Sequence, residues 1–174
     1  MGMTQTLKEN QVVLVLVSSR QYTKAVEKVL KELSKQSLCY VTLNKTAGAV
    51  KDSIGKKSKN IDNLVIVDAI SRTITDKPEE RDDCLFVRSP SALTELSLSI
   101  SKFLEHDFQY LIFDSLTDLL IYQKESPIAK FASNLISKIK STNTKAVLFA
   151  LDLKDHSELI QQISIFADQV VRIE

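Results

Sequence analysis

Short, largely apolar runs that end in polar residues place the strongest limit on how this chain folds. Val, Leu and Ile dominate these runs, and none approaches the roughly 18 residues that a helix needs to cross a bilayer. Runs of about four to eight such residues are typical of parallel strands that are buried on both faces of a sheet. They lie at residues 11–17, 37–43, 63–70, 84–87, 110–113 and 145–151.

Segments with helical periodicity separate the apolar runs. The clearest is 128–140, where Ile128, Phe131 and Leu135 fall on one helical stripe. A final run at 169–173 alternates and predicts an edge strand with one face in water. We therefore predict an α/β fold: a single three-layer α/β/α domain with a mostly parallel sheet of about seven strands and helices on both faces. The other helical segments are residues 22–35, 47–54, 91–105, 116–122 and 156–166.

The domain is expected to span residues 11–174, a length that suits one full core. Residues 1–10 predict a flexible N-terminal lead. Residues 71–83 are the most polar stretch and predict an exposed loop, not a domain boundary, because either side alone would leave a sheet incomplete. Serine–proline pairs at residues 89–90 and 126–127 predict two helix starts.

The charges nearly cancel, since 23 Lys and Arg stand against 22 Asp and Glu for a net charge of +1. No global field attracts nucleic acid, which is not an expected partner. The lysine-rich segment 51–59 predicts a solvated loop after a helix. Cys39 and Cys84 lack CxxC spacing, and neither histidine has a second His or Cys nearby, so no zinc site is expected. With no secretory signal and no membrane-length run, we expect a cytoplasmic protein.

The clearest candidate site is Asp114 with Ser115, which together follow a buried apolar run. Ligands of parallel sheets bind beyond the carboxyl ends of the strands. A phosphate-binding loop would need glycines after the first strand, where residues 18–24 read SSRQYTK. Neither a dinucleotide site nor an ordinary P-loop is therefore expected. From the residues alone, Asp114 either caps the following helix or shares a magnesium ion with Asp152.

Residues 87–122 read VRSPSALTELSLSISKFLEHDFQYLIFDSLTDLLIY. This stretch resembles the Walker B region of RecA/KaiC-like ATPases, and their archaeal members above all. In that family an apolar strand ends in Asp-Ser, and the aspartate helps to hold the magnesium ion of bound ATP. The resemblance places this role on Asp114, with Ser115 after it. The strand and helix order of residues 11–174 is compatible with the same core.

Two parts of that family's site have no counterpart. Residues 18–24 stand where the Walker A loop is expected, and Asn44 and Lys45 stand where the family has a catalytic acidic pair. An amide cannot act as a general base. The resemblance therefore implies a degenerate ATPase fold with no catalytic residues and no required cofactor. Residual contacts with ATP, ADP or Mg²⁺ would come from Asp114, Ser115, Arg20, Lys45 and Arg88, with Asp114 as the metal ligand.

Three functions stay open. The leading hypothesis is a non-catalytic RecA/KaiC-like domain that acts through protein–protein interaction, as a regulatory or scaffold subunit that pairs with itself or with an active RecA-like ATPase. The second is a nucleotide or phosphometabolite sensor without hydrolysis. The third is a metal-dependent enzyme that uses Asp114 and Asp152. We therefore expect a protein partner or a homo-oligomer, no enzymatic activity and no membrane partner.

Overall fold

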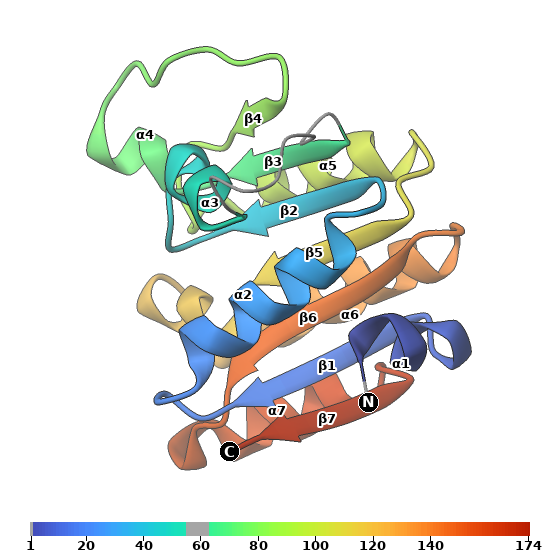
Figure 1. Ribbon diagram of the computed structural model, residues 1–174. Coiled ribbons are helices and arrows are strands. Elements are labelled where there is room, and N and C mark those ends of the chain that lie inside the picture. The colour runs from blue at the N-terminus through green and yellow to red at the C-terminus, as the bar shows by residue number, and fades with distance from the viewer. Residues whose placement is uncertain (1, 55–62) are drawn as a thin grey trace.

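Seven strands form one parallel sheet in the computed structural model, which describes residues 2–54 and 63–174 (Figure 1). The strand order across the sheet is β4-β3-β2-β5-β6-β1-β7, and every neighbouring pair is parallel. The single α/β domain expected from the sequence is confirmed. The strands are β1 Val12–Val17, β2 Leu38–Thr42, β3 Leu64–Asp68, β4 Cys84–Phe86, β5 Tyr110–Asp114, β6 Lys145–Leu151 and β7 Gln169–Ile173.

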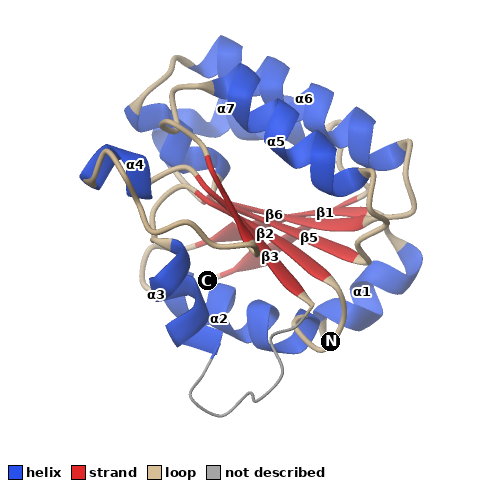
Figure 2. Cartoon of the chain, turned by 90° about the horizontal axis from the view of Figure 1, so that it is seen from above, coloured by secondary structure: helices blue, strands red, loops and turns tan. Residues whose placement is uncertain are grey.

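Helices cover both faces of the sheet (Figure 2). From β1 to β4 the chain moves one way across the sheet, and from β4 to β7 it returns. Because parallel crossovers are right-handed, the two directions place α2 and α3 on one face and α5–α7 on the other, and α1, which precedes β1, packs on the side of α2 and α3. The helical segments are α1 Met3–Glu9, α2 Tyr22–Leu33, α3 Ala47–Ile54, α4 Ser71–Ile74, α5 Leu93–Leu104, η1 Leu116–Ile121, α6 Glu125–Lys140, η2 Lys154–His156 and α7 Ser157–Ser164.

The core has two halves, one on each face of the sheet. Alternate strand residues point to opposite faces, so Val13 and Val15 of β1 join the cluster under α2 and α3. Leu14 and Leu16 join the cluster under α5, α6 and α7. Every residue of β1 is buried, as expected of a strand with helices above and below it. This double burial explains why the inner strands read as continuous apolar runs.

The N-terminal segment differs from the expectation of a flexible lead, because Met3–Glu9 forms helix α1. Met3 and Leu7 lie one turn apart and are buried against the α2 side of the sheet. The carboxylate of Glu32 on α2 accepts hydrogen bonds from the first backbone N–H groups of α1, at Met3 and Thr4. A partner outside the segment therefore orders it, and composition alone does not reveal that partner.

Local boundaries also shift. The two serine–proline pairs do not start helices, since α5 begins at Leu93 after a Ser89–Ala92 turn and α6 begins at Glu125. Helix η1 is a 3₁₀ helix. The polar stretch 71–83 begins with α4, and most of its later residues are exposed. Of the lysine-rich segment, the lysines at 56, 57 and 59 lie outside the described residues.

Strand β7 lies at the edge of the sheet and is mostly exposed, which confirms the expected edge strand. Among the described residues, no helix is long and apolar enough to cross a membrane.

Candidate functional site

Asp114 is the centre of the candidate site, at the carboxyl end of the central strand β5. Its side chain is fully buried, and it accepts hydrogen bonds from three side chains. The hydroxyls of Tyr22 and Tyr40 each lie 2.5 Å from one of its two oxygens. The amide of Asn44 donates to it at 3.2 Å. These neutral donors compensate much of the cost of burying a carboxylate.

Tyr22 reaches Asp114 because the turn after β1 is short. Ser18 donates its backbone N–H to Ile173 on β7, and Gln21 donates to the carbonyl of Ser18. Helix α2 then begins at Tyr22. The turn has no glycine N–H groups that could surround a phosphate. Instead, it places the phenol of Tyr22 in direct contact with the Asp114 carboxylate. The turn is therefore closed over Asp114.

Burial raises the pKa of the Tyr22 phenol above its ordinary range, and the adjacent Asp114 carboxylate raises it further. The same two causes raise the pKa of Tyr40, which lies on β2 and is 1% exposed. Both phenols stay protonated at neutral pH and act as hydrogen-bond donors to Asp114. No local pattern in the sequence predicts this pair of tyrosines, because they come from a helix start and a strand that are far from Asp114 along the chain.

Ser115, and not Asp114, caps the helix that follows. The Ser115 hydroxyl accepts from the backbone of Asp118, and the Asp118 carboxylate accepts from the backbone N–H of Ser115. This reciprocal pair is a capping box. Burial raises the pKa of Asp118. The prediction that Asp114 caps this helix is therefore wrong, because the capping residue is Ser115, one position later.

The three cations predicted to line a residual anion site do not converge. Arg20 follows β1 and Arg88 follows β4, with four strands between them. At about 4.8 Å per strand, these two tips are about 24 Å apart. Arg88 pairs instead with Glu95 on α5. The backbone of Lys45 bonds the hydroxyl of Thr42 within its own turn.

Asp114 and Asp152, the proposed metal pair, follow neighbouring strands, but each carboxylate has separate partners. Strands β5 and β6 are adjacent, as that hypothesis required. Asp152, however, is exposed and forms an ion pair with Arg172 on β7, while the tyrosines occupy Asp114. No group of three or more His, Cys, Asp or Glu side chains with the geometry of a metal site occurs in the part of the chain that the structure describes.

Asp68, at the tip of β3, is also fully buried and has a structural role. One carboxylate oxygen accepts from the backbone of Ala47 and the hydroxyl of Ser71, and the other accepts from the backbones of Ile70 and Ser71. It therefore joins the starts of α3 and α4 to β3. The apolar run at residues 63–70 contains Asp68 but gives no sign of these partners.

No family model matches the chain, and no curated protein matches it. Among solved structures, it is similar to the crystal structure of a KaiC-like protein from the hyperthermophilic archaeon Pyrococcus horikoshii. The TM-score is 0.66 at 11% sequence identity, and the match covers 93% of this chain and 70% of the other. A similarity at this identity shows the fold alone. The chain thus has the RecA/KaiC-like fold that residues 87–122 suggested.

Proposed function

Starting from a RecA/KaiC-like fold, we propose that this chain is a non-catalytic domain that acts by binding protein, first of all a second copy of itself. The observation that carries the proposal is the hydrogen bond from Tyr22 to Asp114. A nucleotide-bound magnesium ion at this strand tip would need the carboxylate face that Tyr22 and Tyr40 occupy. The fold is retained, while the crevice that would serve catalysis is filled by the chain's own side chains.

The edge of the sheet at β7 supports protein binding. The carbonyl of Ile173 faces β1, where it accepts from Ser18. Backbone groups alternate sides along a strand, so those of Val170 and Arg172 face outward from the sheet. An exposed strand edge pairs readily with another extended strand.

Apolar side chains continue this edge onto the α7 face. Ile165 is 78% exposed, Phe166 44% and Val170 37%. Contiguous exposed apolar residues mark interaction surfaces more often than isolated ones do. We refer to Ile165, Phe166 and the strand β7 as the β7 edge.

A second copy fits the β7 edge by symmetry. Two β7 strands, one from each copy, can pair antiparallel about Val170. The outward N–H and C=O of Val170 in one copy then bond the same groups in the other. Two sheets would then join into one.

Light scattering after size exclusion tests this pairing over a dilution series. We expect a dimer for the wild type and for Leu98→Lys, which changes an exposed apolar residue on α5 that is 59% exposed. Val170→Pro should be monomeric, because proline removes an outward N–H without removing a bond to β1. A wild type that is monomeric throughout, or a dimer that survives Val170→Pro, would contradict the proposal.

Catalysis has a separate test, which is phosphate release from Mg²⁺–ATP. We expect no release above a buffer blank from the wild type. Turnover by the wild type that is lost in Asp114→Asn, a variant close in shape to the native residue, would refute the non-catalytic assignment.

The same proposal places the protein in the cytoplasm. Cys39 and Cys84 are separate buried thiols without a disulfide. Burial raises the pKa of Cys39 and raises that of Cys84 to about 12. Thiols that stay protonated and covered are compatible with a reducing compartment.

A further inference from the structure

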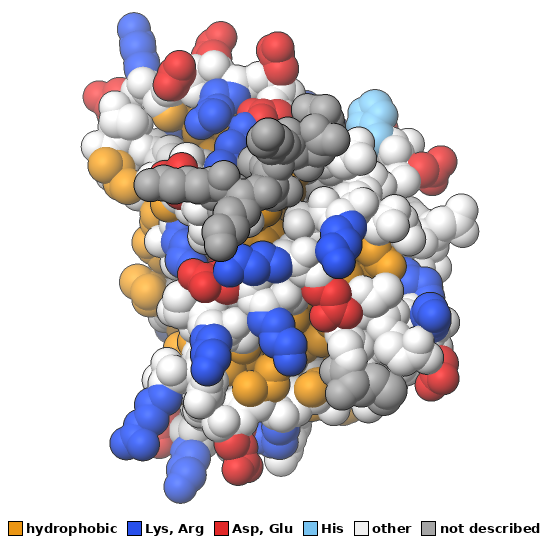
Figure 3. Space-filling model, in the orientation of Figure 1, with side chains coloured by type: hydrophobic (Ala, Val, Ile, Leu, Met, Phe, Trp, Pro, Cys, Tyr) orange, Lys and Arg blue, Asp and Glu red, His pale blue; other side chains and the backbone are white. Residues whose placement is uncertain are grey.

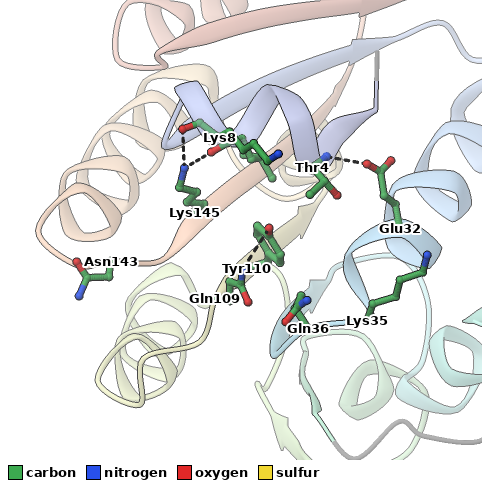
Figure 4. A pocket seen from close by; sticks show the side chains of 10 residues that line it. Thr4, Lys8, Glu32, Lys35, Gln36, Gln109, Tyr110, Asn143 and Lys145 are labelled. Carbon is green, nitrogen blue, oxygen red and sulfur yellow. Dashed lines mark hydrogen bonds between the residues drawn. The ribbon is translucent and has the colours of Figure 1, made fainter.

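A second concave site lies at the opposite end of the sheet from Asp114. A cavity of about 730 Å³ opens at the amino ends of β5 and β6, below α1 and beside the end of α2 (Figure 4). Small-molecule sites usually occupy about 300–1,000 Å³, so this volume is sufficient for a metabolite. Its walls come from rigid elements: Leu7 and Lys8 of α1, Glu32 of α2, Tyr110 of β5 and Lys145 of β6.

Tyr110 supplies a buried polar group that faces this cavity. The residue is only 6% exposed, and its hydroxyl points toward α1 (Figure 4). The hydroxyl oxygen accepts a 3.4 Å hydrogen bond from the side-chain amide of Gln109. Its O–H, however, has no acceptor among residues 2–54 and 63–174. Buried hydroxyls normally donate, so the Tyr110 O–H is available to an acceptor atom in the cavity.

The charges around the cavity favour an anion as that acceptor. Glu32 is the one acidic side chain in its lining, and both of its oxygens accept from the backbone of α1. Lys145 donates to the carbonyls of Leu7 and Lys8 at the end of α1.

Two lysines remain available to a ligand. Lys8 and Lys35 line the cavity, and neither ammonium makes a hydrogen bond or ion pair with any described residue. Lys28 and Lys31 are exposed on the same helix as Glu32, and basic side chains spread over this face of the molecule (Figure 3). These lysines favour an anionic ligand over a cationic one.

We propose that this amino-edge cavity binds a small molecule that carries a phosphate or carboxylate group. Tyr110 donates to one oxygen of the anion, while the exposed side chains of Lys8 and Lys35 turn inward to supply charge-assisted contacts; in Figure 4 the Lys35 ammonium points away from Tyr110. The side-chain amides of Gln36 and Gln109 line the remaining space and suit a neutral polar body. The inference goes beyond the proposed function, because the cavity lies at the far end of the sheet from Asp114 and does not include β7.

Thermal shift and calorimetric titration test the proposal, with pyrophosphate for the phosphate class and citrate for the carboxylate class, at constant ionic strength. We expect a saturable rise in Tm with at least one of the two. Lys8→Gln with Lys35→Gln should lower the affinity at least about tenfold, since charge-assisted hydrogen bonds are lost. Tyr110→Phe keeps the ring and should also weaken binding.

The matched control carries Arg20→Gln and Arg88→Gln, which remove two cations from the carboxyl edge. This variant should bind as the wild type does. An absence of saturable binding by both probes, or binding that survives the Lys8 and Lys35 changes, would overturn the proposal. Neither result bears on the oligomeric state, so failure here and failure of the β7 pairing are distinguishable.

Discussion

Asp114 lies buried at the end of β5, where two tyrosine hydroxyls and one amide are its hydrogen-bond donors. Its position at the end of β5 follows from the apolar run before it, and the sequence located it correctly. Its donors could not be located in the same way. Tyr22 and Tyr40 meet it only because β2 lies beside β5 and because the turn after β1 is short.

The Tyr40 hydroxyl should have a measurable effect on stability. Tyr40→Phe removes a donor from a fully buried carboxylate, and we expect the free energy of unfolding to fall by about 1–3 kcal/mol. Urea denaturation measures this change. The control is Tyr122→Phe, at a tyrosine that is 38% exposed, where the change should stay within about 0.5 kcal/mol. Equal effects at the two positions would contradict the role of Tyr40.

The same phenols predict a loss of stability in alkali. The pKa values of Tyr22 and Tyr40 lie above the value of about 10 that tyrosine has in unfolded chains. The folded state therefore holds these protons more tightly, and the contribution of the two phenols to stability should be constant below about pH 10 and decline above it.

Urea denaturation at rising pH, with tyrosinate absorbance recorded in parallel, checks this dependence. In the variant Tyr22→Phe with Tyr40→Phe the decline should be shallower. A decline that is the same in wild type and double variant would show that other groups cause it.

At the scale of elements, α1 is held by one charged side chain at each end. Glu32 accepts from its first N–H groups, and Lys145 donates to its last carbonyls. Each charge has the sign that the helix dipole favours at that end. A helix of seven residues has little stability alone, so these contacts and the burial of Leu7 account for its order.

Loss of the Glu32 charge should release α1 without unfolding the sheet. Burial raises the pKa of Glu32, but the hydrogen bonds from Thr4 and Met3 outweigh it and hold the pKa below its usual value. Its contribution is therefore present above about pH 4.3 and is lost as the pH falls through the lowered folded value.

Hydrogen exchange at the amides of residues 3–9 measures the docking of α1. We expect faster exchange in Glu32→Gln than in the wild type, while amides of β1 and β6 stay protected. Glu27→Gln, on the same helix, is the matched control and should leave exchange in α1 unchanged. Unchanged exchange in Glu32→Gln would show that the apolar contacts alone hold α1.

For the molecule as a whole, the hydrophobic pattern of the sequence predicted the fold much better than it predicted the candidate site. The apolar runs identified the inner strands because burial on both faces imposes continuous hydrophobicity, as in β1 and β6, while alternation identified the edge strand β7. The order of α1 depends on Glu32, and the closure of the Asp114 site depends on Tyr22. These are contacts between distant segments, and local composition carries no record of them.

The amino-edge cavity also depends on contacts between segments that are distant in the sequence. Lys8, Lys35 and Tyr110 each read as ordinary surface or strand residues in the sequence. Only the packing of α1 across the amino ends of β5 and β6 brings them to one cavity. Tyrosines thus cover Asp114, while the amino-edge cavity was not foreseen.

An NMR titration of the ¹⁵N-labelled protein with Mg²⁺–ATP tests the central claim, closure of the Asp114 site, most directly. The amides of residues 18–24, 44–45 and 114–118 should not shift, because the tyrosines occupy the carboxylate that the metal would need. Any shifts should be confined to the amino edge, around Lys8, Lys35 and Tyr110. Saturable shifts at residues 18–24 together with 114–118 would contradict the account and show that the strand-tip site still accepts a nucleotide.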